Sequence, residues 1–115
     1  MSSVEVIIPI LNITIQFYVG KNANQNSDIV RMAKDEDLWF HVEGHPSCHV
    51  IAIMPSDVDR KKVRYIVKQG AVLCKQHSKF SSNRQVGIVY AYIKDVTPTN
   101  TAGLVLVNGG KIIYV

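Results

Sequence analysis

The sequence predicts a single α+β domain over residues 1–115, with a mostly antiparallel β-sheet, one short helix and one long helix. Three observations lead to this fold class. Segments rich in Val, Ile, Phe and Tyr follow one another with short turns between them, which is typical of β-hairpins. Two other segments carry apolar residues at helical spacing. Strands and helices do not alternate strictly, so a parallel sheet of βαβ units is not expected.

The chain opens with two strands, expected at Val4–Ile10 and Ile13–Val19 and joined at Leu11-Asn12 as a hairpin. A run of asparagine, glutamine and serine follows, and these side chains cap helices or close turns. A short helix is therefore expected at about Ala23–Lys34, with Asn22 as its N-cap.

A third strand is expected at Leu38–Val42, because its residues alternate in character. Trp39 and His41 then share one face, and the three apolar residues between and around them share the other. Residues 44–47 have turn chemistry, and His49–Met54 is an apolar run of strand length. These two strands are expected to pair as a hairpin.

The long helix is expected from a cap at Ser56 or Asp57 to about Lys79, followed by a polar loop at Phe80–Arg84. Its apolar residues form one helical stripe, made of Val63, Ile66, Val67, Gly70, Leu73 and Cys74. At ~100° per residue, five basic residues fall within about 60° of one another on the other side. These five, here named the basic stripe, are Lys61, Arg64, Lys68, Lys75 and Lys79.

The C-terminal part is expected to be β-rich. Val86–Val96 reads as strand, and Thr97–Gly103 reads as a loop. A last hairpin is expected between Leu104–Val107 and Lys111–Val115, because Asn108-Gly109-Gly110 is typical of a tight turn.

Charge is concentrated in one segment. Residues 57–84 hold eight basic residues against two acidic ones, although the whole chain has a formal net charge of only +4. The remainder is therefore weakly acidic. Such segregation favours contact with a polyanion over scattered solubilising charge, with a solvated helix face as the alternative.

Several function classes are disfavoured by composition. No apolar run approaches the ~20 residues of a membrane span, and the N-terminus lacks the basic start of a secretory signal, so a cytoplasmic or nuclear location is expected. Two cysteines, Cys48 and Cys74, are expected as reduced thiols. No spaced ligand pairs or phosphate-binding loop occur, so no metal or cofactor is expected. The acidic run Asp35–Asp37 is interpreted as solvated turn residues. A nucleophile–base pair of Cys48 with His41 or His49 stays open.

The segment VGKNANQNSDIVRMAKDEDLWFHVEGHPSCHVIAI, residues 19–53, resembles the RNA-binding domain NFACT-R of ribosome-quality-control proteins. The motifs that carry the resemblance are Gly20-Lys21-Asn22 with Gln25-Asn26, then Asp37-Leu38-Trp39-Phe40-His41, then Pro46-Ser47 with His49-Val50-Ile51, and the closing Lys111-Ile112-Ile113-Tyr114-Val115. The likeness covers about residues 13–115. Members of that family carry further domains, including a helix-hairpin-helix element and a coiled coil, and the resemblance implies that this chain is the module alone.

The resemblance implies a noncatalytic module that binds ribosomal RNA or transfer RNA, with the large ribosomal subunit as a possible partner and no membrane or small-molecule ligand. The residues expected to contact nucleic acid are Lys21, Asn22, Gln25, Asn26, Trp39, His41, His49, the basic stripe and Arg84. A glycine before a helix start lets backbone N–H groups approach an anion, and amide side chains suit a phosphate, a 2′-hydroxyl or a base edge. Trp39 and His41 can stack a base.

Each assignment has an alternative. Asn22 can be a helix cap, Trp39 can belong to the core, and His49 can be an internal histidine or a support for His41 or the Gly20 loop. At the level of function, the alternatives are a protein-interaction adaptor that docks on an acidic or ribosomal partner, a DNA-binding module, and a small hydrolase that uses His41, His49 and Asp35–Asp37.

Overall fold

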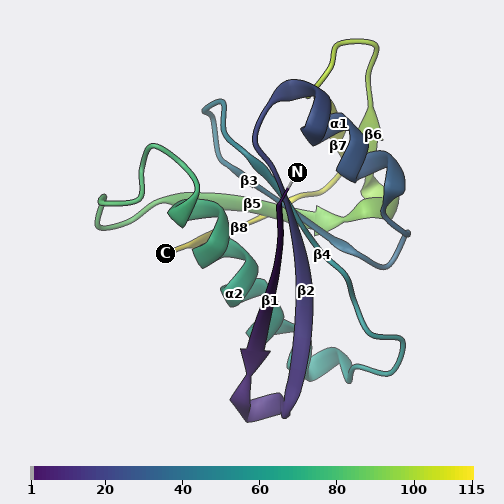
Figure 1. Ribbon diagram of the computed structural model, residues 1–115, viewed down its shortest axis with the longest axis vertical. Helices are drawn as coiled ribbons and strands as arrows, with labels where there is room; N and C mark the ends of the chain where they lie inside the picture. Colours follow the sequence, from purple (N-terminus) through teal and green to yellow (C-terminus); the bar gives the residue numbers. More distant parts are fainter. Residues whose placement is uncertain (1) are drawn as a thin grey trace.

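The computed structural model describes residues 2–115 and confirms the α+β prediction (Figure 1). The strands are β1 (Ser2–Ile8), β2 (Ile13–Gly20), β3 (Leu38–Val42), β4 (His49–Ala52), β5 (Gly87–Tyr92), β6 (Val96–Pro98), β7 (Val105–Val107) and β8 (Lys111–Tyr114), and the α-helices are α1 (Ala23–Met32) and α2 (Val63–Gln76). Short 3-10 helices are η1 (Pro9–Leu11), η2 (Arg60–Lys62) and η3 (Ile93–Asp95). Six strands form one sheet in the order β1-β2-β4-β3-β5-β8, and every neighbouring pair is antiparallel.

One face of the sheet packs on α2. The alternation of β3 sends Leu38, Phe40 and Val42 to this face, as expected, where they meet the buried stripe of the helix. Gly70 lies where the Phe40 ring touches the helix, and a Cβ on Gly70 would collide with that ring. The absence of a side chain at Gly70 therefore lets the aromatic ring pack directly on the helix backbone.

The other face packs on α1 and on a two-stranded ribbon made of β6 and β7. Ile29 and Val30 of α1 form a core with Trp39, Ile51 and Ala91 of the sheet. The two faces of β3 therefore serve two separate apolar clusters. This arrangement makes three layers, with α2 and α1 on opposite sides of the sheet (Figure 1).

The long helix differs from its expected extent. The α-helix begins at Val63, and the preceding turn is the 3-10 helix η2, whose first free N–H groups are capped by Asp59 through a 3.0 Å hydrogen bond from the Lys61 N–H. Ser56 and Asp57 are not the cap. The helix ends at Gln76, so Lys79 lies beyond it. The first strand ends at Ile8, earlier than expected, because Pro9 opens η1 and Asn12 adopts the left-handed conformation. The second strand begins at Ile13, as expected.

The predicted C-terminal hairpin is wrong. β7 pairs with β6 and β8 pairs with β5, so the segments that flank Asn108–Gly110 do not pair with each other. The turn residues instead carry the chain from the ribbon back to the main sheet. The physical reason is that β5 would otherwise leave a row of unpaired backbone groups at the sheet edge, and β8 satisfies them. The expected β-rich run Val86–Val96 contains β5, then η3, and ends at the first residue of β6.

The acidic run Asp35–Asp37 is not uniformly solvated. Asp37 is buried, and its carboxylate accepts 2.9 Å hydrogen bonds from the Lys34 and Met54 N–H groups. It ties the turn before β3 to the segment after β4. Asp35 and Glu36 are exposed, as expected.

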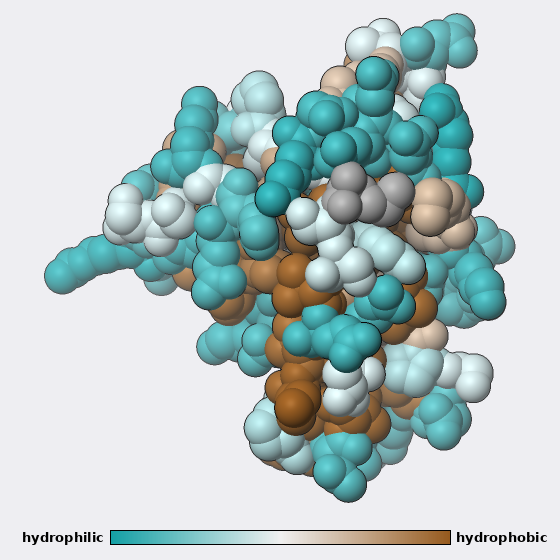
Figure 2. Space-filling view, in the orientation of Figure 1, coloured by the Kyte–Doolittle hydropathy of each residue, from teal (hydrophilic) through white to brown (hydrophobic). Residues whose placement is uncertain are grey.

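The β1–β2 hairpin presents apolar surface to solvent. Figure 2 shows a brown band along this hairpin, whereas the surface around α1 is mostly hydrophilic. Ile7 and Ile10 near the hairpin tip are 70% and 66% exposed. Among residues 2–115, no helix combines the length and the hydrophobicity that a membrane crossing requires.

Candidate nucleic-acid interface

One end of the sheet gathers most of the predicted motif residues. The register pairs Gly20 with His49 and Val42 with Ile88, so β2, β3, β4 and β5 all reach this end. Three connections leave from it: the Gly20–Asn22 segment, the β3–β4 loop and the loop between α2 and β5 (Figure 1). We call this region the sheet end. It brings together segments that are up to about half the chain apart.

The first turn of α1 is capped by its own side chains. The Asn22 carboxamide oxygen accepts a 2.9 Å hydrogen bond from the Gln25 N–H, and the Gln25 side-chain oxygen accepts a 3.0 Å bond from the Lys21 N–H. Asn22 is therefore the N-cap, as expected. The reciprocal bonds hold Lys21 and the positive end of the helix dipole at the surface, where an anion is stabilised.

Gly20 and Asn26 form the base of this turn. Asn26 is buried, and its Oδ1 accepts a 3.1 Å hydrogen bond from the main-chain N–H of His49. A Cβ on Gly20 would collide with that oxygen and would lie 2.9 Å from the Asn26 nitrogen. Glycine is thus required for the close approach of strand and helix. Asn26 acts first as a structural bridge between α1 and β4.

Trp39, His41 and His49 form one ring cluster. The Trp39 and His41 rings are parallel, with centroids 5.7 Å apart and planes 6° apart. The His49 ring meets the edges of both, at 5.5 Å from Trp39 and 4.9 Å from His41. Trp39 is only 3% exposed, which favours the core alternative over base stacking, and His49 is also buried. His41 is the partly exposed member.

Burial changes the acid–base behaviour of both histidines. Desolvation, with repulsion from His41 second, lowers the pKa of His49 to about 4, and a hydrogen bond to the Gly103 main chain partly opposes this. Desolvation also lowers the pKa of His41, against a hydrogen bond to Val42. Both rings are therefore neutral near pH 7 and add no charge to the interface.

The β6–β7 loop fastens α1 from outside. The Gly103 N–H donates a 2.6 Å hydrogen bond to the Ser27 hydroxyl, and Gly103 has a φ of 78°. A Cβ on Gly103 would lie 3.0 Å from the Ala23 Cα. A side chain at this position would be strained and would crowd the helix. Thr97 and Pro98 of the expected loop Thr97–Gly103 belong to β6, and the rest of that loop has a docking role that its composition did not reveal.

The basic stripe lies mostly on a different surface. Lys61, Arg64 and Lys68 are exposed on η2 and α2, in the layer opposite α1. Lys75 is half-buried, and its Nζ donates a 3.1 Å hydrogen bond to the main-chain oxygen of Val115. Lys79 follows the helix and lies 5.4 Å from the Phe80 ring centroid. The five residues are therefore not one continuous line of free charges.

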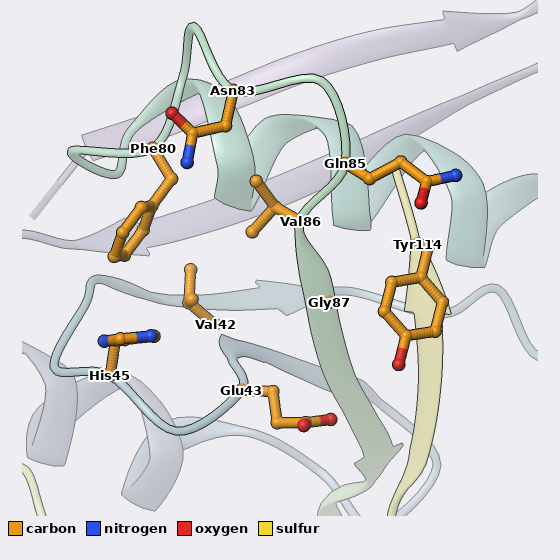
Figure 3. Close-up of a pocket in the computed structure, with 9 residues that line it drawn as sticks. All are labelled: Val42, Glu43, His45, Phe80, Asn83, Gln85, Val86, Gly87 and Tyr114. Carbon is orange, nitrogen blue, oxygen red and sulfur yellow. The ribbon is translucent and has the colours of Figure 1, made fainter.

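A cavity of about 190 Å³ opens at the sheet end, and the sequence did not indicate it (Figure 3). Its lining is contributed by the β3–β4 loop, the loop before β5, and β8. The residues are Val42, Glu43, His45, Phe80, Asn83, Gln85, Val86, Gly87 and Tyr114. Only the succession of Lys79, Phe80 and Arg84 in the loop could have signalled that basic and aromatic side chains meet here.

A larger cavity of about 860 Å³ lies at the opposite end of the sheet, between the turn before β3 and the segment after β4. It is lined by acidic and basic side chains together, among them Asp35, Glu36, Lys34 and Lys94. Its mixed charge gives no preference for a polyanion. Across residues 2–115 no three His, Cys, Asp or Glu side chains are grouped closely enough to hold a metal ion, and both cysteines are buried free thiols.

Residues 12–114 match the family model described as the NFACT protein RNA binding domain. The chain belongs to this family. Among curated proteins, the Rqc2 homolog RqcH of Bacillus subtilis (strain 168) is 31% identical over 85 residues, which cover 73% of this chain and 14% of that protein. Coiled-coil domain-containing protein 25 of Danio rerio is 42% identical over 38 residues, 33% of this chain and 18% of that protein.

A solved structure has a similar fold. The structure of the C-terminal of the fibronectin/fibrinogen-binding protein from Streptococcus suis superposes with a TM-score of 0.76 at 27% sequence identity. The superposition covers 88% of this chain and 40% of that one. This chain therefore corresponds to only a part of each of these relatives.

Proposed function

We propose that this chain is a noncatalytic RNA-binding module that contacts ribosomal RNA or transfer RNA in ribosome-associated quality control. One observation carries the proposal: the fold gathers the Gly20–Asn26 motif and the basic side chains of the α2–β5 loop at the same sheet end. Lys21 comes from one side, and Lys79 and Arg84 come from the other. Cations that distant segments present at one end of the sheet suit the phosphates of a folded RNA.

The roles within this site are unequal. Lys21, Lys79 and Arg84 supply charge, and the capped start of α1 supplies a positive dipole end for one phosphate. His41 offers a ring edge and a hydrogen-bonding nitrogen. Trp39, His49 and Asn26 support these groups from the interior. Lys61, Arg64 and Lys68 extend the contact along α2 and attract RNA without regard to sequence.

The proposal is tested by fluorescence anisotropy with folded transfer RNA, single-stranded RNA, duplex RNA and DNA of matching sequence over a salt series. One variant combines Lys21→Ala, Lys79→Ala and Arg84→Ala, and a second combines Lys61→Ala, Arg64→Ala and Lys68→Ala. The control combines Lys34→Ala with Lys94→Ala at the opposite end of the sheet. Each lost phosphate contact should flatten the slope of log K against log salt by about 0.7 to 0.9.

We expect the sheet-end variant to lose both affinity and RNA preference, the α2 variant to lose affinity for all nucleic acids equally, and the control to bind as the wild type. Binding to no RNA, or an RNA preference that survives loss of the sheet-end cations, would contradict the proposal.

A second candidate function rests on the apolar hairpin tip, where Ile7 and Ile10 are exposed. Such a surface suits docking on another protein. Association with ribosomes that survives ribonuclease treatment but is lost on Ile7→Ser with Ile10→Ser would favour this adaptor function.

A further inference from the structure

The cavity at the sheet end is walled by rings and floored by aliphatic side chains. Phe80 and His45 stand on one side, with ring centroids 4.8 Å apart, and Tyr114 stands on the other (Figure 3). Val42 and Val86 lie between them (Figure 3). Rings at the sides and apolar groups below suit a flat, aromatic ligand.

Tyr114 has a free ring face. Tyr114 is 62% exposed, and a Cβ on Gly87 would lie 3.2 Å from Tyr114 Cε1, so the ring lies against the strand at this glycine. Tyr114 is also one of the residues that line the cavity (Figure 3). An exposed tyrosine that contacts the sheet at one edge can stack with a base. Little side-chain conformational entropy would be lost when the base binds.

Glu43 is the one carboxylate among the residues that line this cavity. Its main-chain N–H donates a 2.9 Å hydrogen bond to the Gly87 carbonyl, which continues the pairing of β3 with β5 and fixes where the side chain starts. Asn83 and Gln85 add amide donors and acceptors to the rim. The cavity therefore offers one carboxylate that can accept two hydrogen bonds and two neutral amides that form weaker ones.

This donor and acceptor pattern matches one nucleobase. Guanine carries two adjacent donors, the ring N1–H and the exocyclic amine, which a carboxylate can accept in parallel. Its O6 can accept from an amide. Adenine and cytosine offer the amine alone beside a ring acceptor that a carboxylate repels. Uracil offers no amine.

The surroundings of the cavity fit a nucleotide in a strand. Lys79 lies over the outside of Phe80, and Arg84 is exposed in the same loop. These cations can hold the flanking phosphates. The Glu43 carboxylate beside these cations repels phosphates and so weakens nonspecific binding of RNA. Its presence is therefore better explained by recognition of a base.

We propose that this cavity binds an unpaired guanine of an RNA strand, with Tyr114 as the stacking ring and Glu43 as the acceptor of its two donors. The inference rests on the proposed RNA-binding function and adds a base preference to it. Unpaired bases are the parts of RNA that proteins read by stacking and by edge hydrogen bonds.

The test measures anisotropy with uridine heptamers that carry guanine, inosine, adenine or uracil at the central position. The wild type should bind the guanine heptamer about tenfold more tightly than the adenine or uracil heptamer, with inosine in between, because inosine lacks the amine. Glu43→Gln should remove this preference while binding of the uracil heptamer stays or tightens. Glu36→Gln, an exposed carboxylate at the opposite end of the sheet, should change nothing. Tyr114→Leu should weaken every heptamer.

Equal affinity for all four heptamers, or a guanine preference that survives Glu43→Gln, would overturn the inference while leaving RNA binding intact. If no heptamer binds, the proposed function fails. Binding of guanine in the cavity is then tested separately by titration followed by backbone NMR. Guanosine 5′-monophosphate should shift the Gln85 and Gly87 amides and uridine 5′-monophosphate should not, and equal responses would overturn the inference. If guanosine 5′-monophosphate competed with an affinity equal to that of the guanine heptamer, the claim that the cavity binds guanine within an RNA strand would be refuted.

Discussion

The Trp39 Nε1–H donates a 3.1 Å hydrogen bond to Nδ1 of His49 inside the sheet-end core. Because Nδ1 accepts, the neutral His49 ring carries its proton on Nε2, on the side where the Gly103 main chain accepts a hydrogen bond. Protonation of Nδ1 would place two donors face to face in a buried site. The folded state therefore favours the neutral form of the His49 imidazole.

Stability is predicted to fall with acidity through His49. Its pKa of about 4 in the folded chain lies below the ordinary value of 6.5, so between these values the unfolded chain binds a proton that the folded chain does not. Stability from this group is complete above about pH 6.5 and declines as the pH falls to about 4, by about 3 kcal/mol. The lowered pKa of His41 acts in the same direction.

Urea unfolding at pH 7.5, 6, 5 and 4 measures this decline. His49→Gln, which cannot titrate, should show a smaller loss over the same range, and the difference between the two curves isolates the imidazole. Parallel curves for the two proteins would show that His49 does not titrate in this way.

Gly70→Ala is predicted to destabilise the fold, although alanine is the better helix former by about 1 kcal/mol. The new Cβ would occupy the space of the Phe40 ring. Overpacking of this kind costs about 1–3 kcal/mol, which exceeds the gain in helix propensity. Thermal and urea unfolding should show the loss, and adding Phe40→Leu should recover part of it. A variant more stable than the wild type would contradict the close contact.

Asp37→Ala should be far more damaging than substitution of its acidic neighbours. The Asp37 carboxylate is the acceptor for the Lys34 and Met54 N–H groups, and each buried donor left without a partner costs about 1–3 kcal/mol. Asp35→Ala and Glu36→Ala should change the free energy of unfolding by only about 0.5 kcal/mol. Equal effects at the three positions would argue against the buried role.

Substitution of Lys68 should affect mainly RNA binding, whereas substitution of Lys75 should affect mainly stability. Lys68 is exposed, so Lys68→Ala should flatten the salt slope of RNA binding by about 0.7 to 0.9 without changing the urea midpoint. Lys75 donates to the Val115 main chain, so Lys75→Ala should cost about 1 kcal/mol of stability and less RNA affinity. The reverse ranking would mean that Lys75 is a free RNA contact.

Local patterns predicted local structure well. The alternation in Leu38–Val42 gave the correct faces of β3, and the Asn22 cap was correct because caps depend on three or four neighbouring residues. The last hairpin failed because Asn108–Gly110 describes a turn and contains no information on which strand has an unpaired edge. Burial of Asp37 and Trp39 depends on partners from distant segments, and no spacing in the sequence reports them.

The sequence proposed residues for the candidate site, but it did not predict how they are arranged. The motif at Gly20–Asn26 was recognised, yet the distance between the basic stripe and that motif follows from the placement of two helices on opposite faces of the sheet. The cavity with Glu43 and Tyr114 joins residues from both halves of the chain. Glu43 and Tyr114 come to the same cavity because β8 pairs with β5 in the sheet.

The Ser27–Gly103 hydrogen bond spans 76 positions of the chain. During synthesis the N-terminal hairpin, α1 and β3 emerge long before the loop that fastens α1 has been made. Contacts of such long range slow folding, because the chain loses loop entropy before they form. The α1 surface is therefore expected to become rigid late, only after the β6–β7 loop with Gly103 has been synthesised and has docked on the helix.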